Sequence, residues 1–133
     1  MQEHGSFEIE VTGQTIRVKL YDQWNSETTV RFISEVKTKA LTIYDKPWAC
    51  LVDLSDWELG TPELWSLFDE ANIWCSEHNQ KYEASVSKLA LHKQVMEKSD
   101  EAFIGVQTNA FGNTPDALAW LESVGIKTTC GGK

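Results

Sequence analysis

The sequence predicts an α/β fold in which a mixed sheet of four to five strands has helices packed against it. Apolar and polar residues alternate near the start of the chain, which is typical of half-buried strands. Segments with helical periodicity then alternate with short apolar runs, as in α/β domains. At 133 residues the chain fits one domain. We therefore expect a single domain over residues 1–133, with a flexible tail over 126–133.

The first half of the chain predicts a hairpin, a helix and a buried strand. Two alternating runs flank Gly13, which indicates a β-hairpin closed at that residue. Asn25 provides an N-cap signal for a helix whose apolar positions continue to Tyr44. The apolar run over 48–54 is continuous rather than alternating. A strand covered on both faces has this pattern, so we expect it at the centre of the sheet.

The second half predicts a loop over 55–60 followed by a strong helix start at Thr61-Pro62-Glu63. There a hydroxyl could cap the helix, a proline suits its first turn, and an acid lies near its positive end. A strand, a short helix, a weak strand and a last helix ended by Gly125 follow in order, over residues 82–91, 93–102, 106–111 and 117–124.

The charge balance argues against two classes of partner. The chain has 12 Lys and Arg residues and 20 Asp and Glu residues. The resulting formal net charge of −8 repels phosphate backbones and anionic lipids. The start of the chain lacks a basic segment followed by an apolar one, and no apolar run reaches the ~20 residues that span a bilayer. We therefore expect a cytoplasmic protein that binds neither nucleic acid nor a membrane.

Three stretches carry a resemblance to a known family. They are the strand ending Asp53-Leu54-Ser55, the helix entry Thr61-Pro62-Glu63-Leu64-Trp65, and the terminal Pro115-Asp116-Ala117-Leu118-Ala119-Trp120-Leu121. Together they resemble the SpoIIAA-like group of STAS domains, a family related in shape to anti-sigma-factor antagonists and loosely to the lipid-carrying Sec14 fold. The resemblance spans nearly the whole chain and implies a STAS-like fold.

The resemblance does not extend to the phosphorylation switch of the family. In phosphorylated antagonists the kinase target is a serine at a helix start, and the corresponding stretch here reads Thr61-Pro62-Glu63-Leu64, without a serine. A switch would therefore require Thr61 to replace the serine. A proline directly after Thr61 and an acid beside it favour a structural cap instead.

The segment from Asp53 to Trp65 is the predicted binding site. Asp53, Ser55 and Thr61 lie outside the carboxyl end of a central strand, where open α/β sheets commonly bind ligands such as a small anion or a peptide. Trp57 in a polar loop and Trp65 beside the main apolar stripe could face a groove or a second subunit. The alternatives are that Asp53 and Ser55 only organise the loop through local hydrogen bonds, and that both tryptophans only pack in the core.

No complete catalytic or metal-binding set is recognisable. The sequence has no nucleophile elbow, phosphate-binding loop, dinucleotide-binding fingerprint or zinc-protease motif. Cys75 and His78 share a helix face, but a zinc site would need further ligands. Cys50 and Cys75 fall in apolar segments and Cys130 in the tail, so we expect free thiols rather than a disulfide framework. We expect no metal, no cofactor and no enzymatic activity.

The sequence therefore favours a non-enzymatic, STAS-like regulatory or binding module, which binds a protein or a small ligand through residues 53–65. We expect it to form a homodimer or to bind another protein. A carrier of a small hydrophobic ligand, similar to Sec14, and a small enzyme using the same pocket are the alternatives. A regulatory fold that acts only by dimerising is a third possibility.

Overall fold

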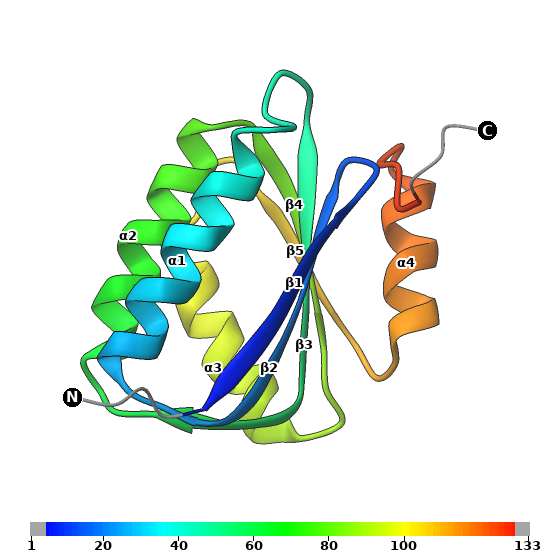
Figure 1. Cartoon of the computed structure of the whole chain (residues 1–133). Helices are drawn as coiled ribbons and strands as arrows, with labels where there is room; N and C mark the ends of the chain where they lie inside the picture. Colours follow the sequence, from blue (N-terminus) through cyan, green and yellow to red (C-terminus); the bar gives the residue numbers. More distant parts are fainter. Residues whose placement is uncertain (1–4, 130–133) are drawn as a thin grey trace.

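A five-stranded mixed sheet forms the centre of the protein (Figure 1). The structure is a computed structural model that describes residues 5–129. The order of strands and helices matches the one expected from the sequence. The strands are β1 (Ser6–Thr12), β2 (Thr15–Trp24), β3 (Trp48–Gly60), β4 (Gln80–Val86) and β5 (Gln107–Phe111), and the helices are α1 (Ser26–Ala40), α2 (Leu64–Glu77), α3 (Ala90–Asp100) and α4 (Thr114–Ser123).

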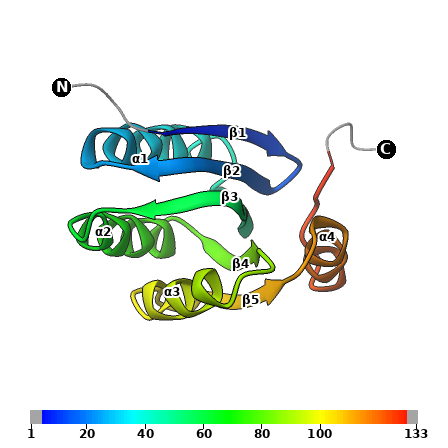
Figure 2. The ribbon, with the colours of Figure 1, turned by 90° about the horizontal axis from the view of Figure 1, so that it is seen from below.

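The strands lie side by side in chain order, with β3 at the centre as predicted. β1 and β2 form the expected antiparallel hairpin, and β2 to β5 run parallel to one another. Viewed from below, α1, α2 and α3 cover one face of the sheet, and α4 lies on the other (Figure 2). The carboxyl ends of the parallel strands therefore meet at one edge, the lower one in Figure 1.

Both faces of β3 are buried, which explains its continuous apolar sequence. Cys50, Val52 and Leu54 belong to the core cluster on the side of α1 and α2. Ala49 and Leu51 belong to a second cluster, which includes Ala117 and Leu121 of α4. No helix within residues 5–129 is long and apolar enough to cross a membrane.

β3 is longer than predicted, and the loop expected over 55–60 is wrong. Lys19 of β2 pairs with Asp53, whereas Tyr21, two residues later, pairs with Asp56, so β3 carries one extra residue at this point. Such a bulge reverses which face each following side chain occupies. It explains why the stretch after Asp53 lacks a strand-like alternation although it stays in the sheet.

The helix start predicted at Thr61 is also wrong. Residues 61–63 form a turn in which the Leu64 N–H donates to the Thr61 carbonyl at 3.1 Å, and α2 begins at Leu64. Glu63 occupies the N-cap position, and no side chain caps the helix. The turn redirects the chain directly after Gly60, which packs closely against Leu64 and the Trp24 carbonyl. Thr61 is exposed.

The strand predicted over 82–91 ends at Val86. Its last two apolar residues, Leu89 and Leu91, lie at the start of α3 and are 57% and 56% exposed. The Leu89 N–H donates to Ser87 Oγ at 3.1 Å, a local bond that ends the strand and turns the chain into the helix. The short helix, weak strand and last helix predicted beyond this point are present, with shifted bounds.

Residues 126–129 are packed against the hairpin rather than forming a loose tail. Ile126 and Thr128 are buried. The Lys127 carbonyl accepts hydrogen bonds from the Gln14 N–H at 3.0 Å and from Thr15 Oγ1 at 2.8 Å. The flexible tail predicted over 126–133 is therefore wrong for this part, and its remainder, including Cys130, lies outside the described residues.

Candidate functional site

The carboxyl end of β3 carries the first two residues predicted to bind. Asp53 is half-buried, and its Oδ1 accepts a hydrogen bond from the Ser55 N–H at 2.9 Å. This is the local bond that the structural alternative predicted for the pair. The hydrogen bond lies within the bulge of β3, and Ser55 is exposed. Asp53 therefore shapes the strand as well as contributing charge to its surface.

Lys19 of β2 joins the two aspartates of β3. Its Nζ lies 3.9 Å from Asp53 Oδ2 and 3.3 Å from Asp56 Oδ2. The hydrogen bond with Asp56, and next the charge of Asp53, raise the pKa of Lys19 above its usual value. Because the side chains of Lys19 and Asp56 are 35% and 57% exposed, solvent screens these ion pairs, which contribute little to stability and mainly arrange the surface charges.

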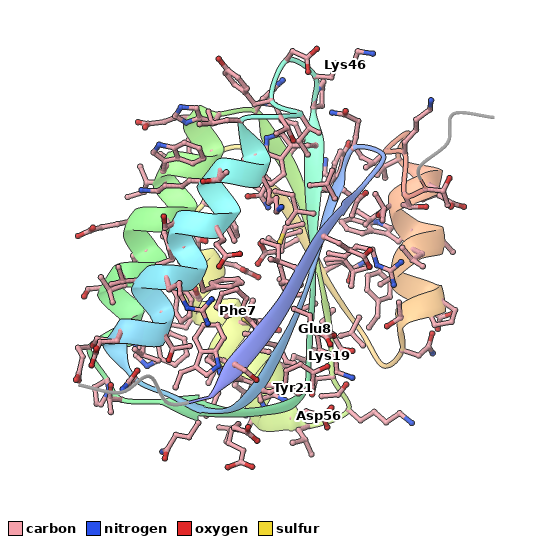
Figure 3. All side chains as sticks on the ribbon, in the orientation of Figure 1. Phe7, Glu8, Lys19, Tyr21, Lys46 and Asp56 are labelled. Carbon is pink, nitrogen blue, oxygen red and sulfur yellow. The ribbon has the colours of Figure 1, made fainter. Side chains whose placement is uncertain are left out.

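A second polar pair lies beside this one. The Tyr21 hydroxyl donates to Glu8 Oε1 at 2.9 Å, and this bond raises the pKa of Tyr21. The Lys19 ammonium lies 5.4 Å from the centre of the Tyr21 ring. Figure 3 shows Glu8, Lys19, Tyr21 and Asp56 together at the lower end of the sheet. Phe7, the neighbour of Glu8, points to the opposite face, toward α1.

A shallow groove of about 390 Å³ runs along this part of the sheet. Side chains of β1, β2 and β3 form its floor, and Thr114 at the start of α4 lies at its boundary. The charged lining residues are Glu8, Glu10, Arg17, Lys19 and Asp53. A groove with charges of both signs and few apolar groups suits an extended polar segment better than a hydrophobic molecule.

The carboxyl ends of β2 and β3 together form an acidic surface, which we name the acidic edge. Its residues are Asp22, Asp53, Asp56, Glu58 and Glu63, of which all except Asp53 are exposed. Lys19 is the cation paired with this group among the described residues. The acidic edge therefore carries a strong local negative charge in a chain that is already acidic.

Trp57 and Trp65 lie next to each other. Trp57, however, does not lie in the loop that the sequence predicted. It belongs to β3 and is 3% exposed, because the bulge turns its side chain into the core. Its ring meets that of Trp65 edge-on at 6.1 Å, and Phe68 lies against both. Trp65 is half-buried. The pair therefore forms an aromatic layer directly beneath the acidic edge.

A cavity of about 80 Å³ lies on the side of the sheet that α1, α2 and α3 cover. Its lining is almost entirely apolar and includes Trp57, Trp65, Phe68 and Met96. Sites that hold small organic ligands usually measure ~300–1,000 Å³, and one water occupies ~30 Å³ of liquid. The cavity is therefore too small for a lipid or a comparable hydrophobic molecule.

One wall of this cavity carries a buried acid, Glu83, which interacts with the half-buried Asp100 of α3. Burial, and next the nearby Asp100 carboxyl, raise the pKa of Glu83 well above its usual range. Burial also raises the pKa of Asp100 to about 6. Gln80 Nε2 donates to Glu83 Oε1 at 3.3 Å. The sequence analysis missed this pair because a polar residue next to Ala84 in a strand is expected to face solvent.

The buried cysteines border the same region. Burial, and next the charge of Glu83, raise the pKa of Cys75 to about 12, and burial raises the pKa of Cys50 well above its usual value. His78 donates through Nδ1 to the Trp74 carbonyl at 2.8 Å. Within residues 5–129 no group of three or more His, Cys, Asp or Glu side chains could hold a metal ion.

Ser87 and His92 form a further pair that the sequence analysis missed. Ser87 Oγ lies 2.7 Å from His92 Nδ1, and His92 Nε2 lies 2.7 Å from the Trp57 carbonyl oxygen. Reading 82–91 as one strand hid the turn that brings the two residues together. The signal available in the sequence was a serine directly after an apolar strand, five residues before a histidine.

A wider surface groove lies at the opposite edge of the sheet. It measures about 780 Å³, and Lys46, Lys81 and Lys127 line it. All four helices end toward this edge, and Lys46 stands at the far end of the molecule from Asp56 (Figures 1 and 3). Lys46 and Lys127 lie in the segments that follow α1 and α4, and Lys81 lies in β4, so the lysines of this groove come from three separate parts of the chain.

Comparisons with known proteins support the fold rather than a specific activity. No protein-family model and no curated protein matches the chain. Thirteen chains of solved structures do, and two of them illustrate the match. An uncharacterised protein of the DUF3478 family with a SpoIIAA-like fold, from Shewanella loihica, aligns with a TM-score of 0.66 and 15% identity, covering 91% of this chain and 96% of its own.

The second structure is an anti-sigma factor antagonist from Mycobacterium paratuberculosis. It aligns with a TM-score of 0.60 and 13% identity over 90% of this chain and 95% of its own. Identities this low establish the fold alone. They confirm at that level the resemblance found in the sequence: this chain has the SpoIIAA-like fold.

Proposed function

We propose that this chain is a non-enzymatic regulatory module that binds a protein partner through the acidic edge and the segment 53–65. The observation that carries the proposal is the gathering of exposed carboxylates at the carboxyl ends of β2 and β3. A solved structure of the same fold is described as an anti-sigma factor antagonist, which supports a regulatory role. The cytoplasmic location expected from the sequence remains a prediction.

The partner would present a basic surface. Opposite charges accelerate encounter and orient the two proteins, so a basic segment would be drawn to this edge. Asp53 would supply charge, and the exposed Ser55 and Thr61 would supply hydroxyl groups. Trp65 would contribute apolar contact, while the buried Trp57 supports Trp65 from below.

The internal cavity does not favour the Sec14-like carrier. At about 80 Å³ it lacks the volume for a hydrophobic cargo. A protein partner needs no such space, because it binds to the outside of the domain. The surface chemistry therefore favours protein binding over carriage of a small hydrophobic ligand.

A homodimer is compatible with the proposal only if it uses another surface. Two copies of the acidic edge would repel each other, since both carry the same charge. A dimer would then leave both acidic edges free for partners. Sedimentation velocity tests this part separately, because a monomer at micromolar concentration would contradict the dimer without affecting the acidic edge.

Charge reversal tests the proposal. The bait carries Glu58→Lys and Glu63→Lys, two exposed residues of the acidic edge. The matched control carries Glu77→Lys and Glu101→Lys, which are also exposed, change the net charge by the same amount and lie at the carboxyl ends of α2 and α3. Partners captured from extracts of the source cells are quantified by mass spectrometry.

We expect the wild type and the control to capture the same protein. The captured amount of this protein should be at least about tenfold lower with the Glu58→Lys, Glu63→Lys variant. The captured protein should bind the purified wild type directly. Equal capture by both variants, with circular dichroism showing both folded, would contradict the acidic edge as the binding surface.

A further inference from the structure

Ser87, His92 and the Trp57 carbonyl form a linear hydrogen-bonded chain at the carboxyl edge of the sheet. Ser87 follows the last residue of β4, and its N–H donates to the Phe111 carbonyl at 3.0 Å, which fixes its backbone. His92 lies in the first turn of α3 and is 3% exposed. Ser87 is half-exposed, so solvent or a small molecule can reach its hydroxyl while its partner remains buried.

The hydrogen bonds determine the tautomer of His92. The Trp57 carbonyl can only accept, so His92 Nε2 carries the proton and donates to it. In the neutral ring Nδ1 then carries no proton and can only accept. The Ser87 hydroxyl therefore donates the hydrogen bond of 2.7 Å to Nδ1. Ser87 is therefore paired with a base, and that base is oriented by a third group. This is the arrangement that activates a serine nucleophile.

Backbone amides add to the polarisation of Ser87. The Leu89 N–H donates to Ser87 Oγ at 3.1 Å, which favours negative charge on that oxygen. No side chain caps α3, and its first-turn amides lack intrahelical acceptors. Such amides favour an oxyanion formed beside the helix start.

A pocket of about 310 Å³ opens directly onto this chain of hydrogen bonds. Ser87 and His92 both line it, together with Phe111 and the exposed residues Lys88 and Lys93. The volume suits a small acyl group, and the two ammonium groups favour one that carries a carboxylate.

We propose that Ser87 is a modification site, at which its hydroxyl, with His92 as general base, accepts an acyl group from a small anionic thioester. Ser87 Oγ forms a bond to the acyl carbon and the carbon–sulfur bond breaks. The hydroxyl proton passes to His92 Nδ1 and from there to the departing thiolate. The products are an acyl-serine ester and a free thiol. This inference is independent of partner binding at the acidic edge.

Two probes test it on the purified full chain. The first is a succinyl thioester of N-acetylcysteamine, and the second is a fluorophosphonate, whose phosphorus reacts with activated serines with loss of fluoride. Intact mass spectrometry counts adducts, and peptide sequencing locates them. Hydroxylamine removes an ester on serine and leaves an amide on lysine. The fluorophosphonate adduct persists even if an acyl ester is hydrolysed.

Three variants separate activation from simple exposure. Ser87→Ala removes the acceptor. His92→Gln keeps a donor toward the Trp57 carbonyl but places no base beside Ser87, and general-base catalysis is typically worth a hundredfold or more, so we expect labelling to slow by about 10²-fold. Ser66→Ala is the control, because the Ser66 hydroxyl also lies at a helix start but donates to the Glu63 carbonyl at 3.2 Å.

We expect one adduct per chain on Ser87 with either probe, unchanged in Ser66→Ala, slowed in His92→Gln and absent in Ser87→Ala. Replacing Lys88 and Lys93 by Gln should slow the succinyl reaction about two- to fivefold and leave a neutral acetyl thioester unaffected. The proposal would be overturned if neither probe modified Ser87, if adducts spread over lysines alone, or if folded His92→Gln reacted at the wild-type rate.

Discussion

The indole of Trp57 packs edge-on against that of Trp24, with ring centres 5.9 Å apart and an interplanar angle of 76°. Trp24 ends β2 and Trp57 lies near the end of β3, and they are 1% and 3% exposed. Phe32 and Phe68 close the same cluster. The acidic edge thus rests on a rigid aromatic layer, which holds its carboxylates in place on the surface.

Trp57→Ala should therefore act on stability. Removing a buried aromatic side chain costs about 3–5 kcal/mol through lost burial and the cavity left behind. The change is measured by urea unfolding, with the slope of the transition compared with that of the wild type. Trp65→Ala is the control, because Trp65 is only half-buried and should cost less. A loss below about 1 kcal/mol for Trp57→Ala would contradict its place in the core.

Gly60→Ala should destabilise the protein by about 1–3 kcal/mol. A Cβ at this position would clash with Leu64 Cδ1 and lie 2.5 Å from the Trp24 carbonyl oxygen. At Gly112, by contrast, a Cβ would meet no atom within 4 Å, so Gly112→Ala should change stability by less than about 0.5 kcal/mol. Thermal unfolding of both variants measures the difference. Equal effects would show that α2 does not pack tightly against the end of β2.

The acid pair Glu83 and Asp100 should make stability depend on pH. Burial raises both pKa values in the folded chain, to about 6 for Asp100 from an ordinary 3.8, so protonation favours folding. This contribution is complete below about pH 4 and is lost as the pH rises through 6 and, for Glu83, beyond it. Stability should therefore fall across this range.

Glu83→Gln keeps the hydrogen bond to Gln80 and removes the ionisation. The variant should be more stable than the wild type near pH ~8 and lose this advantage near pH ~4. Urea unfolding over the range measures the difference between the two proteins, which removes the contributions of the other carboxylates. A difference that does not vary with pH would mean that Glu83 titrates normally in the folded chain.

Cys50 and Cys75 should be almost unreactive toward Ellman's reagent in the folded protein. The thiolate is the reactive form, and burial raises the pKa of Cys75 to about 12 and that of Cys50 well above its usual value. The measurement uses a Cys130→Ser background, so that these two thiols report alone. Rapid reaction of either thiol without denaturant would contradict its burial, whereas reaction in urea should follow unfolding.

Periodicity was sufficient to predict the hairpin, the central strand and the alternation of helices and strands, because these patterns report which face of each element is buried. It failed where the backbone departs from a regular element. The bulge after Asp53 reverses the alternation, so Trp57 looked like a loop residue although it is in the core. The turn at Ser87 interrupts a run of apolar residues that otherwise continues as a strand.

The candidate site was only partly predictable for the same reason. Asp53 and Ser55 are close in sequence, and their hydrogen bond follows from local geometry. The contact between His92 and the Trp57 carbonyl joins residues 35 positions apart, so it exists only in the folded sheet. Burial of Glu83 likewise depends on helices packed over that face of β4, which its own segment does not encode.

Site-specific photo-crosslinking tests the binding surface most directly. A benzophenone amino acid replaces Glu58 on the acidic edge, or Glu77, another exposed acid at the far end of α2, and each protein is irradiated in extracts of the source cells. We predict that position 58 crosslinks to one protein and that position 77 does not crosslink to the same protein. The crosslink from position 58 should disappear at high salt. The same product from both positions, or none from position 58, would contradict binding at the acidic edge.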